Sequence, residues 1–124
     1  MFEGKAEEAV NFYISLFEDS KILQLSRYQE GETGAAGTVK QALFSLNGQN
    51  FMAIDSIVKH GFFFTPAISL YVKCATENEI DHLFRELSDN GSVLMPLAKY
   101  PFSEKFGWIN DRFGVSWQLS LETT

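Results

Sequence analysis

Polar side chains that could bind a ligand alternate with apolar ones near the end of the chain. In residues 115–121, Gln118 lies between Ser116 and Ser120, and the intervening side chains are apolar. A period of two predicts a strand whose apolar row is buried. The polar row would suit the floor of a cleft, where the amide of Gln118 could donate and accept hydrogen bonds. The alternative is a solvated strand face.

An aromatic side chain with two possible roles, Trp108, lies in the strand predicted for residues 107–110. Residues 111–114 predict a hairpin turn before the next strand, because Gly114 can adopt a positive φ. Trp108 could stack on a flat ligand or pack beneath a helix. Trp117, in the apolar row of the second strand, is expected in the core.

Two further candidates, Gln41 and Asp55, lie in the first half of the chain. Gln41 shares a predicted strand face with Val39 and Leu43. This mixed face suits a pocket, although a period of two does not decide which face points inward. Asp55 ends a predicted strand, where its carboxylate could line a cleft or cap the turn at Ser56.

The histidines and the cysteine do not form a recognisable catalytic or metal-binding pattern. His60 lies in a linker, and His82 lies off the apolar face of a predicted helix. A complete metal site is not expected, because it needs three or four converging ligands. Cys74 has no neighbouring basic cluster, so a buried, inert thiol is expected rather than a nucleophile.

A basic and aromatic group near the predicted loop of residues 96–104 allows two interpretations. Lys99, Tyr100 and Lys105 could hold an anionic ligand. The alternative is a charged, solvated loop.

Helical and alternating patterns predict the elements that must position these residues. Two helices are expected, over residues 6–17 and 76–90, the second with a capping box formed by Thr76 and Glu79. Met1–Glu3 would be the tail of a strand. The predicted strands cover residues 21–28, 38–46, 51–55, 67–72, 92–95, 107–110 and 115–121.

The order strand-helix-strand-strand-strand occurs twice. Module one covers about residues 1–55 and module two about residues 67–124, joined by a linker over residues 56–66. The linker contains three consecutive phenylalanines at positions 62–64, which could be a lid, a dimer contact or a buried segment. We expect a single α+β domain in which two βαβββ modules form curved mixed sheets around a cleft, with the helices on the outer face.

Composition excludes several classes of partner. The net charge of −6 disfavours a nucleic-acid backbone or an anionic membrane. No apolar run is long enough to span a bilayer, and no signal peptide is recognisable. The lone cysteine excludes an internal disulfide, which fits a cytoplasmic location.

The sequence resembles the vicinal oxygen chelate superfamily of glyoxalase I, extradiol dioxygenases and bleomycin-resistance proteins. It is most similar to the PhnB-like branch, also called the 3-demethylubiquinone-9 3-methyltransferase domain. The resemblance covers nearly the whole chain and is carried by Phe2–Ala9, Phe12-Tyr13, Leu16-Phe17, Asn47-Gly48-Gln49, Phe51-Met52, Asp55, Pro66-Ala67, Ser69-Leu70, Val72, Leu94-Met95-Pro96, Gly107-Trp108 and Trp117-Gln118-Leu119. The branch usually has a longer first strand, which implies that the N-terminus is truncated.

The resemblance also implies where a metal would bind in relatives that use one. Their usual glutamate falls at Gln118, and their usual second-module histidine falls at about Ala67. Gln41 lies where PhnB-like relatives often have a histidine. Too few ligands remain, so no metal or other cofactor is expected. The methyltransferase label finds no support either, because no Gly-rich turn could seat a nucleotide-bearing cofactor.

We therefore expect a PhnB-like small-molecule-binding protein, a homodimer without a complete metal site. Gln41, Asp55, Trp108 and Gln118 would contact the ligand. One alternative is a divalent-metal-dependent lyase, isomerase or dioxygenase of the same superfamily. Another is a structural or partner-binding domain with a filled cleft.

Overall fold

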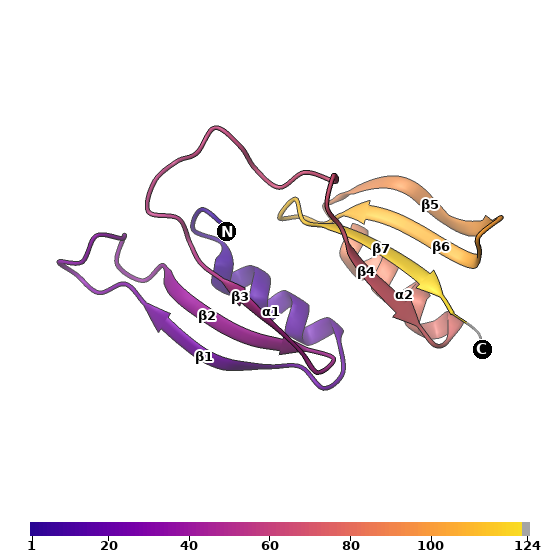
Figure 1. The fold of residues 1–124 in the computed structure, drawn as a ribbon, viewed down its shortest axis with the longest axis horizontal. Helices are drawn as coiled ribbons and strands as arrows, with labels where there is room; N and C mark the ends of the chain where they lie inside the picture. Colours follow the sequence, from indigo (N-terminus) through magenta and orange to yellow (C-terminus); the bar gives the residue numbers. More distant parts are fainter. Residues whose placement is uncertain (123–124) are drawn as a thin grey trace. The chain divides into compact units, whose positions relative to one another are not determined.

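The chain forms two sheets, each with one helix packed on one face (Figure 1). The computed structural model describes residues 1–122. These residues divide into two compact units, unit 1 up to Gly61 and unit 2 from Phe62 onward. The boundary falls within the segment 56–66 that the sequence predicts as a linker. The α+β class is confirmed.

Unit 1 contains one helix and three antiparallel strands. These are α1 (Ala6–Leu16), β1 (Lys21–Arg27), β2 (Val39–Leu46) and β3 (Gln49–Ala53), in the sheet order β1-β2-β3. Phe2 forms an isolated parallel bridge with Asp55, beyond the end of β3. Its amide donates to the carbonyl of Ile54 at 2.8 Å. The expected strand tail at Met1–Glu3 is thus reduced to this bridge.

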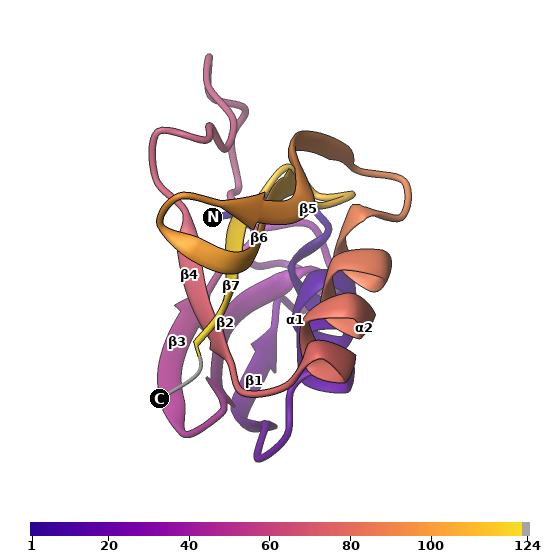
Figure 2. The same cartoon turned by 90° about the vertical axis from the view of Figure 1, so that its right-hand side faces the viewer.

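Unit 2 repeats this arrangement with four strands. It contains β4 (Leu70–Cys74), α2 (Glu77–Ser88), β5 (Ser92–Tyr100), β6 (Ser103–Asn110) and β7 (Ser116–Leu121). The sheet order is β4-β7-β6-β5, and β4 runs parallel to β7. Figure 2 shows α2 along one side of this sheet. The bridge at Phe2 occupies in unit 1 the position of β4 in unit 2, so the predicted repetition of elements is present in the topology.

The prediction of a loop over residues 96–104 is wrong. β5 continues to Tyr100, a turn at Pro101-Phe102 follows, and β6 begins at Ser103. Pro96 suggested a break because proline cannot donate a backbone hydrogen bond. β5 is an edge strand with register shifts on either side of Pro96, and proline is tolerated in such strands.

The start of α2 agrees with its sequence signals. The hydroxyl of Thr76 accepts a hydrogen bond from the amide of Glu79 at 3.1 Å. The carboxylate of Glu79 accepts one from the amide of Ala75 at 2.7 Å, one residue before the partner expected in a capping box. The buried face of α2 consists of Ile80, Leu83 and Leu87.

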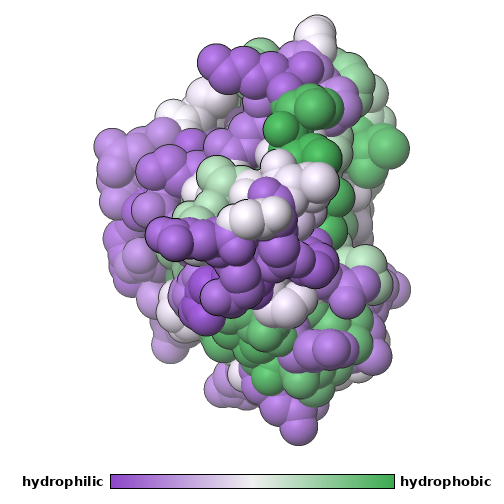
Figure 3. All heavy atoms as spheres, turned by 90° about the vertical axis from the view of Figure 1, so that its left-hand side faces the viewer, coloured by the Kyte–Doolittle hydropathy of each residue, from purple (hydrophilic) through white to green (hydrophobic). Residues whose placement is uncertain are grey.

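Among the described residues, neither helix has the length and apolarity needed to cross a membrane. The surface drawn in Figure 3 is hydrophilic over much of its area, with hydrophobic patches in between.

Candidate functional site

The two faces of the unit 2 sheet differ in chemistry, and α2 covers only one of them. The carboxylate of Asp81 on α2 lies 2.6 Å from the ammonium of Lys105 on β6. A Cβ added to Gly107 would lie 2.6 Å from the ring of Phe84 on α2. Because Lys105 and Gly107 alternate along β6 with Trp108, Trp108 lies on the opposite face. We call this opposite face the open face of unit 2.

Trp108 and Gln118 are direct partners on the open face. They pair across the antiparallel strands β6 and β7. Trp108 also pairs with Met95 on β5, and Gln118 pairs with Tyr71 on β4. These four side chains form a row across all four strands, which we call the Trp108 row. It contains no permanently charged side chain.

The serines on either side of Gln118 are buried rather than solvated. Ser116 and Ser120 are each 2% exposed, while Gln118 is half-buried. The indole N–H of Trp108 donates to the hydroxyl of Ser116 at 2.8 Å. Ser116 is in turn 2.8 Å from the hydroxyl of Ser69. The polar row on β7 is therefore partly an internal hydrogen-bond network, and Gln118 is its half-exposed member.

The side-chain amide of Gln118 makes no hydrogen bond to any other residue within 1–122. An amide carries two donors and an acceptor oxygen. A half-buried amide is stabilised by hydrogen bonds that replace those it loses to water. Gln118 can therefore form hydrogen bonds with a molecule that lies against the Trp108 row.

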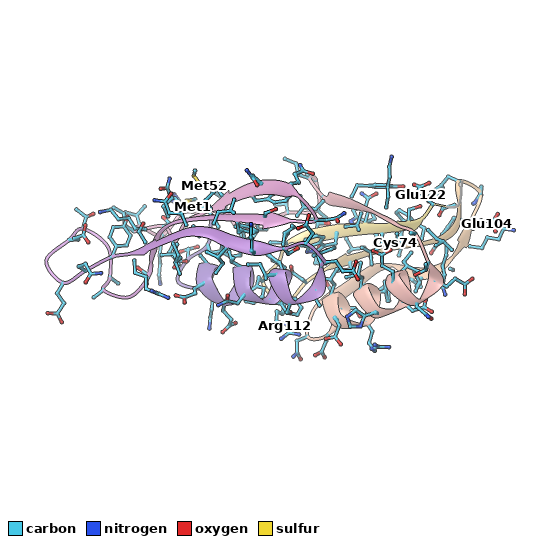
Figure 4. The ribbon with its side chains drawn as sticks, turned by 90° about the horizontal axis from the view of Figure 1, so that it is seen from below. Met1, Met52, Cys74, Glu104, Arg112 and Glu122 are labelled. Atoms are coloured by element: carbon cyan, nitrogen blue, oxygen red, sulfur yellow. The ribbon has the colours of Figure 1, made fainter. Side chains whose placement is uncertain are left out.

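Gln41 lies on the exposed side of unit 1, away from α1. Its amide is 3.5 Å from the sulfur of Met52, which is 61% exposed and points away from α1 in Figure 4. The sequence-based grouping of Gln41 with Val39 is wrong, because the pairing register shifts between Ser26 and Arg27 opposite this segment. Such an irregularity interrupts the alternation of faces. Val39 is consequently buried, as Ala42 is.

Asp55 is a structural carboxylate in this chain. It is 4% exposed. One oxygen accepts from the amides of Gly4 at 2.8 Å and Ala6 at 3.0 Å, at the start of α1. The other accepts from the amide of Val39 at 2.9 Å. Asp55 thus caps α1 and fixes β2, instead of capping a turn at Ser56.

Asp111 is a buried carboxylate that the sequence analysis did not single out. It is 3% exposed and accepts hydrogen bonds from the amides of Phe113 at 2.8 Å and Val115 at 3.0 Å. It also accepts one from the indole N–H of Trp117 at 2.9 Å. An aspartate at the first position of a four-residue turn is the signal that could have identified it.

Most of the side chains within residues 1–122 that were considered as metal ligands have other partners in the protein. Within residues 1–122, no three His, Cys, Asp or Glu side chains gather in a metal-binding arrangement. Both oxygens of Asp55 already accept backbone hydrogen bonds. His60 is 3.0 Å from the hydroxyl of Ser56, and His82 is exposed beside Arg85. Burial, reinforced by the charge of Glu79, raises the pKa of the Cys74 thiol to about 12, so it is protonated at neutral pH.

An open pocket of about 320 Å³ lies at the β5–β6 turn, and its lining includes Lys99, Tyr100 and Phe102. Lys99 faces the carboxylate of Glu104 at 3.7 Å. Lys105 does not line this pocket, because its ammonium pairs with Asp81 on the α2 side of the sheet. The suggestion that Lys99, Tyr100 and Lys105 together hold an anion therefore does not fit the geometry.

The phenylalanine run in the linker is exposed. Phe62, Phe63 and Phe64 are 61%, 78% and 37% exposed. The interpretation as a buried segment is wrong, and the lid and the dimer contact remain as alternatives.

Comparison of the sequence and the fold with known proteins shows which family the chain belongs to. The chain matches the family described as 3-demethylubiquinone-9 3-methyltransferase over residues 1–120. It is 63% identical to a PhnB protein from Bacillus cereus, with a TM-score of 0.97, covering 98% of this chain and 95% of that one. Comparison with curated proteins gave no match.

More distant structures share the fold. Protein PA1353 from Pseudomonas aeruginosa is 24% identical with a TM-score of 0.86, covering 99% of this chain and 93% of that one. A glyoxylase/bleomycin resistance protein/dioxygenase domain from Frankia sp. EAN1pec is 15% identical with a TM-score of 0.63, covering 92% and 87%. The fold is thus of the glyoxalase and bleomycin-resistance type. Within that class, the chain belongs to the 3-demethylubiquinone-9 3-methyltransferase, or PhnB-like, family, as its sequence indicated.

Proposed function

We propose that this protein binds an uncharged small molecule on the open face of unit 2 and that it needs no metal to do so. The observation that carries this proposal is the pairing of Trp108 with Gln118. A planar aromatic surface next to an unpaired amide is a common composition of ligand sites, which combine apolar walls with a few polar groups. The absence of permanent charge along the Trp108 row favours an uncharged ligand.

Of the four site residues expected from the sequence, Trp108 and Gln118 form the core of the proposed site. Gln41 is proposed as a ligand contact on the exposed side of unit 1. Asp55 is left out, because its carboxylate oxygens already accept three backbone hydrogen bonds and it is buried.

We also propose that the protein is a homodimer and functions in the cytoplasm. Exposed apolar side chains support the dimer, because large apolar patches on a monomer commonly mark interaction sites. Ile68 is 82% exposed and Phe63 is 78% exposed. Light scattering coupled to size-exclusion chromatography tests this proposal, which a monomer at all accessible concentrations would contradict.

The site itself can be tested with a panel of uncharged aromatic fragments and ¹H–¹⁵N NMR spectra of the full chain. We expect binders to shift the indole N–H of Trp108 and the side-chain NH₂ of Gln118. Gln118→Ala should weaken binding by about two- to tenfold without changing Tm, because one neutral hydrogen bond contributes roughly 0.5–1.5 kcal/mol. Gln24→Ala, at an exposed glutamine of β1, serves as the control. Shifts confined to other surfaces would contradict the proposal.

A further inference from the structure

The hydrogen bonds around Trp108 have a fixed direction. An indole N–H is a donor only, so the hydroxyl of Ser116 must be the acceptor in its 2.8 Å contact with Trp108. Ser116 is 2% exposed, and leaving its own proton unpaired would be unfavourable. Among residues 1–122, the acceptor available to that proton is the hydroxyl of Ser69, at 2.8 Å. Trp108 therefore donates to Ser116, and Ser116 donates to Ser69.

This chain of bonds ends at the proton of Ser69. Ser69 accepts from Ser116, and within the described part of the protein its hydroxyl contacts no further acceptor. Ser69 is half-buried and directly precedes β4. Its proton is therefore free to bond to water or to a bound molecule. The series of hydrogen bonds from Trp108 through Ser116 makes the Ser69 hydroxyl a stronger donor, because successive hydrogen bonds polarise one another.

A second pair of serines on the same strand provides a contrast. Ser120 on β7 lies 2.8 Å from the hydroxyl of Ser103. Ser103 donates its own proton to the carbonyl of Lys105 at 2.9 Å. This second series of hydrogen bonds ends at a backbone carbonyl of the protein, so it offers no donor to a ligand. Of these two serine pairs, only the pair of Ser116 and Ser69 leaves a hydroxyl proton available to a ligand.

Ser69 lies next to the aromatic surface of the proposed site. Two hydrogen bonds of 2.8 Å each connect its oxygen to the indole nitrogen of Trp108. The Ser69 hydroxyl is thus near the N–H edge of the Trp108 ring, where an oxygen attached to a stacked ring could accept its proton. The amide of Gln118, the strand partner of Trp108, lies on the same face.

We propose that Ser69 is a specificity-determining residue that donates a hydrogen bond to an acceptor oxygen on the ligand. The ligand class is an uncharged, planar ring compound with a carbonyl group next to the ring. This inference rests on the proposed function, since it concerns a molecule bound on the open face.

The test compares two probes of similar shape, 2-acetylnaphthalene and 2-ethylnaphthalene, which differ in the carbonyl. Affinities are measured by NMR titration for the full chain and for Ser69→Ala. We expect Ser69→Ala to lower the ketone-to-hydrocarbon affinity ratio by about two- to tenfold, the effect of one neutral hydrogen bond. Comparing ratios cancels differences in probe hydrophobicity and small changes in protein stability.

Two variants serve as controls. Ser69→Thr keeps a hydroxyl and should preserve the ratio. Ser103→Ala removes a half-buried hydroxyl that also bonds to a serine of β7, and it should leave the ratio unchanged. A ratio that is the same in Ser69→Ala as in the unaltered chain overturns the inference but leaves the proposed function intact. Failure of both probes to bind overturns both.

Discussion

The indole N–H of Trp117 donates a hydrogen bond to the carboxylate of Asp111 at 2.9 Å, and both side chains are almost fully buried. The other carboxylate oxygen accepts from the amides of Phe113 and Val115 in the turn. One side chain thus links the β6–β7 turn to the core side of β7. The register of these two strands aligns Trp108 with Gln118, so Asp111 supports the proposed site from a distance.

Replacing this carboxylate should destabilise the protein. Asp111→Asn retains the shape but replaces one acceptor oxygen with an NH₂ group that faces donors. We expect the free energy of unfolding to fall by about 1.5–3 kcal/mol, the usual range for hydrogen bonds to charged groups. Urea denaturation measures this change. Asp89→Asn is the control, because Asp89 is exposed and pairs with Arg112 only at 3.4 Å. Equal effects of the two substitutions would contradict the role assigned to Asp111.

Local signals in the sequence predicted much of the fold. The turn at Asn47-Gly48 has positive φ at both residues, and Gly114 has φ of 92°, as their residue types indicate. The hairpin itself was predicted, but its register was not. A four-residue turn over 111–114 would place Trp108 opposite Trp117, whereas Asn110 pairs with Ser116 and Trp108 lies opposite Gln118. Contacts between distant segments were not predictable in this way. The bond from Val39 to Asp55 and the irregular pairing of β1 with β2 depend on tertiary packing, which a period of two does not encode.

Asp55 should matter for stability rather than for ligand binding. Asp55→Ala leaves the amides of Gly4, Ala6 and Val39 without their acceptor, two of them at buried positions. We expect a loss of about 3 kcal/mol or more, since each unpaired buried donor costs roughly 1–3 kcal/mol. Thermal or urea unfolding measures it. Asp55→Asn, which keeps one acceptor oxygen, should lose less and should bind the aromatic fragments as the unaltered chain does. Weaker fragment binding by folded Asp55→Asn would return Asp55 to the site.

Gly91 should tolerate no side chain. A glycine just after a helix often adopts a left-handed conformation that ends the helix, but this is not the reason here. The left-handed residue after α2 is Asn90, with φ of 60°. A Cβ at Gly91 would lie 2.1 Å from the carbonyl oxygen of Asn110, a backbone atom that cannot move aside cheaply. Gly91→Ala should therefore cost about 2 kcal/mol or more. Gly61→Ala is the matched control, because its Cβ would meet no atom within 4 Å, and it should change stability by less than about 0.5 kcal/mol.

Divalent metals should not stabilise the protein. A ligand that binds only the folded state raises Tm in proportion to the logarithm of its concentration above Kd. Gln118 has a neutral amide, both carboxylate oxygens of Asp55 accept backbone hydrogen bonds, and no three His, Cys, Asp or Glu side chains within residues 1–122 gather in a metal-binding arrangement. We expect excess Mg²⁺, Mn²⁺, Ni²⁺ or Zn²⁺ to leave Tm unchanged within error in differential scanning fluorimetry, with and without prior chelator treatment. A saturable rise with one of these ions would favour the metal-dependent enzyme instead.

Cys74 should make stability depend on pH in the alkaline range. Burial and the nearby Glu79 raise the thiol pKa from 9.0 to about 12, so the folded state holds a proton that the unfolded state releases earlier. This contribution to stability is complete below the unfolded pKa and is lost as pH rises toward the folded value. Urea unfolding across this range should show that the free energy of unfolding declines more steeply with pH for the unaltered chain than for Cys74→Ala. This variant lacks the thiol but keeps the other groups that titrate at alkaline pH, such as Lys105. The native thiol should also react with a disulfide reagent much more slowly than the urea-unfolded chain. Parallel stability curves for the two proteins would show that the buried thiol does not carry this effect.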